Sequence, residues 1–133
     1  MYTSEVIYLG GLRTQAKHMV SESVMITDAP IDNQGKGEAF SPTDLLATSL
    51  AQCMMTIMGI EAVKLDVNLT GTKIEVTKKM TVSPRKVAKI DIVFYLPESA
   101  FKYKIELEHA ALNCPVALSL NPELKQHVVF NYV

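Results

Sequence analysis

Two cysteines, Cys53 and Cys114, are the residues of this 133-residue chain best suited to covalent chemistry. Their separation is far larger than zinc-ligand spacings, and no second ligand pair accompanies them, so we expect no metal site. The N-terminal residues do not form a signal peptide, and we therefore expect a cytoplasmic protein. In a reducing compartment two cysteines are more often free or redox-active than a permanent bridge, although an inert, buried role is the alternative for each.

The surroundings of each cysteine suggest how it would be activated. Cys114 directly precedes Pro115, a residue favoured at the first position of a helix, so Cys114 is expected at or beside the N-cap, where unpaired amides favour a thiolate. Cys53 lies in an apolar segment and would need a neighbouring cation. Arg13 is a candidate, because arginine keeps its charge even in apolar surroundings. The methionines beside Cys53 (Met54, Met55 and Met58) could line an adaptable apolar pocket.

Cys53 belongs to the stretch around which the chain is organised, residues 41–60, which predicts a long helix continuing to about residue 65. Ser41 suits the N-cap, Pro42 the first helical position, and Asp44 a reciprocal capping contact. The helix is apolar nearly all round, so it must be buried on all sides, and a partner chain could supply part of the cover. We expect it to be too short and too interrupted by polar residues to span a membrane.

The remaining elements and the charge narrow the class of protein. Strands are predicted over residues 4–9, 12–18, 24–27, 73–82, 87–96 and 127–133, and further helices over 99–113 and 115–120. Gly10 and Gly11 predict a hairpin turn, and residues 28–40 a long loop. The length fits one domain over residues 1–133. A net charge of −1 gives no support for nucleic acid or an anionic membrane as partner.

Three segments resemble the OsmC/Ohr family. Residues 35–45 (Gly-Lys-Gly-Glu-Ala-Phe-Ser-Pro-Thr-Asp-Leu), running on to Cys53, resemble the start of that family's central helix. Asn113-Cys114-Pro115-Val116 resembles its second cysteine motif. Tyr8-Leu9-Gly10-Gly11-Leu12-Arg13 is similar to the strand that carries the family's arginine. The resemblance extends over the whole chain in the same order, and it places the chain in an OsmC-like branch.

The resemblance implies an α+β fold, with antiparallel sheets around long central helices and two chains intertwined in a homodimer. It also implies a thiol-dependent peroxidase that reduces organic hydroperoxides and contains no cofactor. Cys53 would attack the peroxide, Arg13 would hold it as a thiolate, and Cys114 would resolve the sulfenic acid as an intramolecular disulfide. The reductant would be an external dithiol, for which the family suggests dihydrolipoyl groups.

One position departs from the family pattern. Thr43 stands where the family usually has a catalytic glutamate after a proline. Asp44 is adjacent, but nine residues at about 100° each put it on the opposite side of a helix from Cys53, so it is interpreted as a capping residue. Glu38, on the loop, is the better candidate to bond Arg13, and a solvated loop charge is its alternative. The missing glutamate favours a rival function, a non-catalytic dimer that binds a hydrophobic small ligand in the same cleft.

Overall fold

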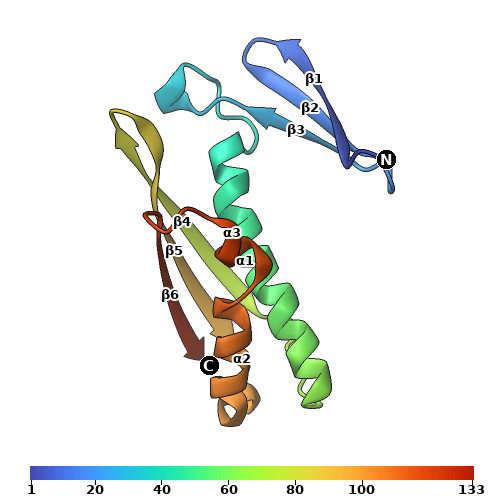
Figure 1. The fold of residues 1–133 in the computed structure, drawn as a ribbon, viewed down its shortest axis with the longest axis vertical. Helices are drawn as coiled ribbons and strands as arrows, with labels where there is room; N and C mark the ends of the chain where they lie inside the picture. The colour runs from blue at the N-terminus through green and yellow to red at the C-terminus, as the bar shows by residue number, and fades with distance from the viewer. The chain divides into compact units, whose positions relative to one another are not determined.

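The computed structural model describes all residues, 1–133, and the chain divides into two compact units, Met1–Leu45 and Leu46–Val133. Figure 1 shows the elements, and each unit is described by itself. The elements are β1 (Ser4–Gly10), β2 (Arg13–His18), β3 (Val24–Asp28), η1 (Ile31–Asn33), α1 (Pro42–Lys64), β4 (Lys73–Val82), β5 (Arg85–Leu96), η2 (Glu98–Tyr103), α2 (Lys104–Leu112), α3 (Pro115–Ser119) and β6 (Lys125–Tyr132). The α+β class is thereby confirmed, whereas the single domain stays a prediction.

The first unit is a three-stranded antiparallel sheet in the order β1-β2-β3. Its first hairpin turns at Gly11 and Leu12 rather than at Gly10 and Gly11, because Gly10 pairs with Arg13 across the ladder. Both turn residues have positive φ, 61° and 62°, which is the conformation that matches the twist of a two-residue hairpin. A leucine in this conformation is uncommon, and this is why the sequence pointed to the two glycines instead.

The loop after β3 is closed by its own backbone. The amide of Asp28 donates to the carbonyl of Phe40 at 3.0 Å, and that of Gly37 donates to Ala29 at 3.1 Å. Gly35 packs so closely on Ala29 that a Cβ would lie 1.8 Å from the Ala29 carbonyl oxygen, so only glycine fits there. The short helix η1 is the single regular element of a segment expected to have none.

The predicted helix start is confirmed at α1. The Asp44 amide donates to the Ser41 hydroxyl, and the Ser41 amide donates to the Asp44 carboxylate, each at 3.0 Å. Pro42 is the first helical residue. The reciprocal pair satisfies two amide donors that the helix itself leaves unpaired.

Within this chain α1 is buried on one face only. Its buried residues are Ala47, Leu50, Ala51, Met54, Met58 and Ala62, whereas Ile60 is 53% and Val63 81% exposed. By length and composition this helix, of 23 residues, is sufficient to cross a membrane, so the expectation that it is too short was wrong. A single helix of this kind is weak evidence for a membrane, since core helices pass the same test.

The second unit contains the hydrophobic core. Its sheet has the order β4-β5-β6, and β5 pairs antiparallel with β4 but parallel with β6, so the expectation of wholly antiparallel sheets was wrong here. The helices of this unit cover one face of the sheet (Figure 1). Inward residues of β5, such as Ile90, Ile92 and Phe94, are fully buried against residues of α1, α2 and α3. The helix expected over 99–113 is divided into η2 and α2.

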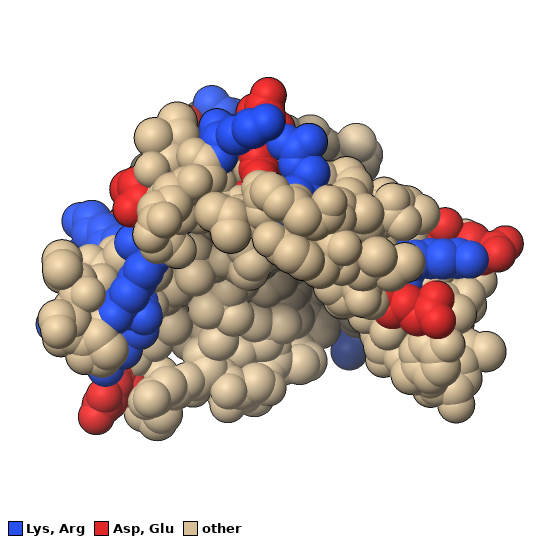
Figure 2. All heavy atoms as spheres, turned by 90° about the horizontal axis from the view of Figure 1, so that it is seen from above, with Lys and Arg blue, Asp and Glu red and all other residues tan.

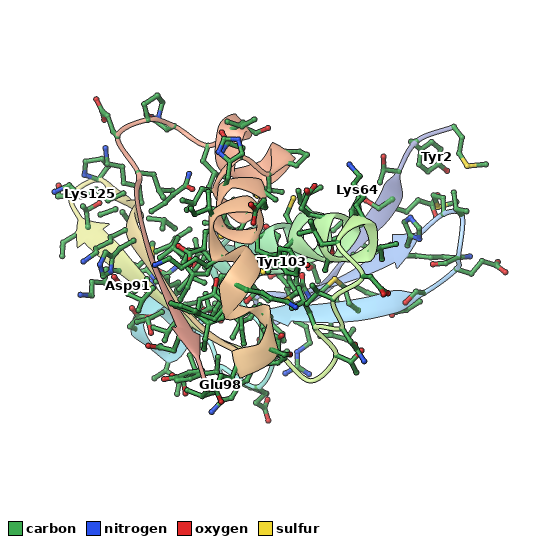
Figure 3. All side chains as sticks on the ribbon, turned by 90° about the horizontal axis from the view of Figure 1, so that it is seen from below. Tyr2, Lys64, Asp91, Glu98, Tyr103 and Lys125 are labelled. Carbon is green, nitrogen blue, oxygen red and sulfur yellow. The ribbon has the colours of Figure 1, made fainter.

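The opposite face of this sheet is polar. Asp91 accepts ion pairs from Lys89 at 3.2 Å and from Lys79 at 3.5 Å, and it also bonds His127. Figure 3 shows Asp91 and Lys125 on this outer side of the strands. Acidic and basic side chains form small mixed groups separated by wide uncharged areas on the face in Figure 2, as a net charge of −1 leads one to expect.

Candidate functional site

The second unit brings Cys53 and Cys114 together. Cys53 lies midway along α1 and is partly exposed, and Cys114 is fully buried at the N-cap of α3. Neither forms a disulfide. The two thiols are close enough for a side-chain interaction that raises the pKa of Cys114. Two residues distant in sequence therefore form one dithiol site.

Burial sets the protonation of Cys114. Desolvation raises the pKa of its thiol, and Cys53 raises it further, although the Ala117 amide donates to Sγ at 3.4 Å and opposes the shift. The expectation that a helix start makes Cys114 a thiolate was therefore wrong. Burial in an apolar environment penalises the charged form more than one long hydrogen bond at a five-residue helix favours it.

A groove lies along α1, and its lining includes Gln52, the sequence neighbour of Cys53, but not Cys53 itself. Its volume is ≈ 490 Å³, and it is lined by Thr48, Ala51, Gln52, Met55 and Thr56 of α1 and by Ile74 and Val76 of β4. Among the three methionines expected to line a pocket, only Met55 does so. Met54 and Met58 are fully buried in the core. Four of the lining residues are apolar, and three are polar: Thr48, Gln52 and Thr56.

The first unit holds a compact charged group around Arg13. Nη2 of Arg13 donates to Oδ2 of Asp28 at 3.1 Å and to Oε1 of Glu38 at 3.0 Å. These contacts raise the pKa of Arg13, with the Asp28 hydrogen bond as the largest cause. The expected pairing of Glu38 with Arg13 is thus present, but Glu38 shares the guanidinium with a second carboxylate.

Asp28 is the residue that sequence reasoning missed. Its side chain is fully buried, whereas that of Glu38 is 61% exposed. It was assigned to the loop, but it is the last residue of β3 and is the cross-strand neighbour of Arg13. Pairing the two predicted strands in register would have set this carboxylate opposite the arginine, and cross-strand neighbours of opposite charge attract.

The other candidate positions are also defined. Thr43, at the usual glutamate position, has its hydroxyl 3.2 Å from that of Ser41, and Asp44 takes part in the capping pair as interpreted. No group of three or more His, Cys, Asp or Glu side chains is arranged to hold a metal ion. The groups suited to chemistry are the two thiols of the second unit and the permanently charged guanidinium of the first.

Comparisons with known proteins agree with this arrangement. Residues 35–128 match the family model described as OsmC-like protein. The solved structure of an osmotic stress induced and detoxification response protein from Psychrobacter arcticus 273-4 is 51% identical, with a TM-score of 0.94 over 98% of this chain and 96% of that one. No curated protein matches the chain.

More distant structures share the fold. An organic hydroperoxide resistance protein, OsmC, from Legionella pneumophila is 16% identical with a TM-score of 0.77, covering 98% of each chain. Another, from Vibrio cholerae with captopril in an active site, is 15% identical with a TM-score of 0.76, over 100% of this chain and 94% of that one. The family model covers most of the chain, and the 51% identical relative aligns over nearly all of it. The chain belongs to the OsmC-like protein family.

Proposed function

We propose that the protein is a thiol-dependent peroxidase that reduces organic hydroperoxides. The observation that carries the proposal is the dithiol of the second unit, in which a partly exposed cysteine lies beside a buried one whose pKa is raised. A peroxidase of this type needs one accessible thiol to meet the peroxide and one protected thiol to react afterwards. Hydroperoxide resistance is named for two distant structures of the same fold, and it fits the family.

The reaction balances with these two residues. The Cys53 thiolate attacks the terminal oxygen of ROOH, the O–O bond breaks, and the alcohol leaves with a proton, so Cys53 becomes a sulfenic acid. The Cys114 thiol then bonds the Cys53 sulfur, and water leaves with the hydroxyl group. The resulting disulfide prevents further oxidation. A dithiol from outside the protein, of the dihydrolipoyl type, reduces it again.

Arg13 is proposed to favour the Cys53 thiolate. This part rests on the resemblance of residues 8–13 to the family's arginine strand. Its support is that Arg13 is held in one position by two carboxylates and keeps its charge at any physiological pH. Glu38 is proposed to be the acidic residue that bonds Arg13 in place of the usual glutamate, whose position Thr43 occupies.

The active protein is proposed to be a homodimer. In the first unit the buried residues are polar, namely Thr27, Asp28 and Ser41, while apolar side chains of β1 such as Val6 and Tyr8 are each 64% exposed. A three-stranded sheet without a buried apolar face is not stable alone. The uncovered face of α1 likewise needs a partner, and a second copy of the chain presents the same surfaces.

A second candidate is a non-catalytic dimer that binds a hydrophobic small ligand. The groove of ≈ 490 Å³ along α1 and the threonine at position 43 favour it. One experiment separates the candidates: reduced protein receives one equivalent of cumene hydroperoxide, and free thiols are counted. The peroxidase loses two thiols per chain and releases one equivalent of cumyl alcohol. The binding module keeps both thiols.

A further inference from the structure

We propose that Asp28 is a positioning residue that fixes the guanidinium of Arg13 and the backbone of Glu38 as one rigid group. The inference rests on the proposed role of Arg13 and adds the residue that holds Arg13 in place. The resemblance to the OsmC/Ohr family implies no role for Asp28. The argument comes from its burial, its three contacts and its position at the end of β3.

Burial distinguishes the two carboxylates that share Nη2 of Arg13. The Asp28 side chain is 0% exposed and that of Glu38 61% exposed, at contact distances of 3.1 and 3.0 Å. An exposed ion pair holds its partners weakly, because water and salt compete with it. A buried carboxylate has no water to exchange for its partner, so breaking its contact leaves an uncompensated charge. Asp28 is therefore the carboxylate that fixes the geometry.

One oxygen of Asp28 organises both the strand and the loop. Oδ2 accepts the Arg13 contact and also the backbone amide of Glu38 at 3.0 Å. The amide of Asp28 in turn donates to the Phe40 carbonyl at 3.0 Å. The last three residues of the loop, 38–40, are thus held at both ends by Asp28: Glu38 by the Asp28 side chain, and Phe40 by the Asp28 backbone amide. Glu38 reaches Arg13 from a backbone that Asp28 has already placed.

The remaining oxygen gives a second, independent observation. Oδ1 of Asp28 is buried and has no hydrogen-bond partner in the structure. Leaving a buried acceptor unpaired is unfavourable, so the contacts of Oδ2 must offset this cost. The pKa of Asp28 is nevertheless lowered, first by the Glu38 amide and then by Arg13, so the charged form is the one that the site retains. The charged Asp28 carboxylate therefore orients the Arg13 guanidinium through Nη2. Neither Asp28 nor Glu38 bonds Nε or Nη1 of Arg13.

The test measures how fast iodoacetamide alkylates Cys53 at neutral pH, resolved by mass spectrometry in reduced protein. Arg13→Ala, Asp28→Asn and the double variant are compared. If Asp28 acts by placing Arg13, Asp28→Asn slows alkylation about tenfold, as loss of the thiolate-favouring charge would. The same change has no further effect in the Arg13→Ala background. If Asp28 only neutralises Arg13, Asp28→Asn accelerates alkylation, and the inference is overturned.

The outcomes separate this inference from the proposed function. If Arg13→Ala leaves the alkylation rate unchanged, the proposed role of Arg13 fails and the inference fails with it. If Arg13→Ala slows alkylation but Asp28→Asn does not, only the inference fails. An equal slowing by Asp28→Asn in both backgrounds indicates a general structural defect and also overturns it.

A spectroscopic measurement covers the case in which Asp28→Asn does not fold. In protein labelled with 15N-arginine, a guanidinium anchored by a buried carboxylate gives separate Nη signals, whereas a freely rotating one gives an averaged signal. Arg85 is the only other arginine of the chain, so Arg13→Ala is sufficient to assign the Arg13 signals. We expect separate Arg13 signals that persist in the surface variant Glu38→Gln. Averaged Arg13 signals in the unmodified protein, or loss of the separate Arg13 signals in Glu38→Gln, would show that Asp28 is not the anchor.

Discussion

Cys114 lies beside Cys53 in a fully buried position, and this burial raises the pKa of the Cys114 thiol. At neutral pH Cys114 is therefore a protonated thiol that meets no solvent. Cys53 is the partly exposed member of the pair. Both residues are thiols, but only Cys53 is accessible to solvent and to a peroxide. We therefore expect Cys53 and Cys114 to react differently with peroxide.

We expect Cys53→Ser to abolish consumption of cumene hydroperoxide, because the nucleophile is lost. Cys114→Ser should still react once, but Cys53 would then remain a sulfenic acid and proceed to sulfinic acid in excess peroxide. Mass spectrometry of the treated variants distinguishes the two. Over-oxidation of Cys114 in Cys53→Ser, with Cys53 resistant in Cys114→Ser, would reverse the assignment.

Arg13→Ala should slow the alkylation of Cys53 at neutral pH, since it removes a permanent positive charge that is proposed to favour the thiolate. The rate is measured as a function of pH, with Arg85→Ala as the matched control. Identical pH profiles for Arg13→Ala and the unmodified protein would remove Arg13 from the site.

The protein should sediment as a dimer, at twice the chain mass of 14.7 kDa, at micromolar concentration. The physical reason is the apolar surface of β1 and of the outer face of α1, which one chain leaves uncovered. Val63→Lys, at an 81% exposed position of that face, should weaken the dimer, and Lys64→Ala, at its neighbour, should not. A stable, folded monomer in the unmodified protein contradicts the proposal.

Ser41→Ala should lower the free energy of unfolding by about 1 kcal/mol, because it removes the acceptor for the Asp44 amide at the start of α1. Chemical denaturation measures the change. Ser49→Ala is the control: the Ser49 hydroxyl donates only to the Leu46 carbonyl within the helix, and alanine is the better helix former there. Equal losses in both variants would show that the cap itself contributes nothing.

Tyr132 should titrate above the ordinary tyrosine value of 10.0, because burial, and then its hydrogen bond to Glu108 at 2.9 Å, raise its pKa. A folded pKa above the unfolded one stabilises the fold below pH 10, and this contribution is lost as the pH rises further. Tyr132→Phe should therefore be less stable than the unmodified protein at pH 8, with a difference that shrinks above pH 10. A constant difference would contradict the raised pKa.

Local chemistry made part of the fold predictable. The capping residues Ser41 and Asp44 act on amides three residues away, so their spacing in sequence was sufficient to set the start of α1. The boundaries of β4 were likewise predicted at Lys73 and Val82, since alternation and the following Ser-Pro are local signals. The two cysteine motifs and residues 8–13 indicated the family for the same reason: each is a short, continuous segment.

Tertiary structure decided the features that depend on neighbours distant in sequence. Cys114 stands at a helix start, where local reasoning predicted a thiolate, but core packing around it removes water and raises its pKa. The pairing of β6 parallel to β5 follows from where the intervening helices return the chain. Asp28 faces Arg13 only because β2 and β3 pair in one register. Burial and register are sums over many distant contacts, and no single segment of the sequence contains them.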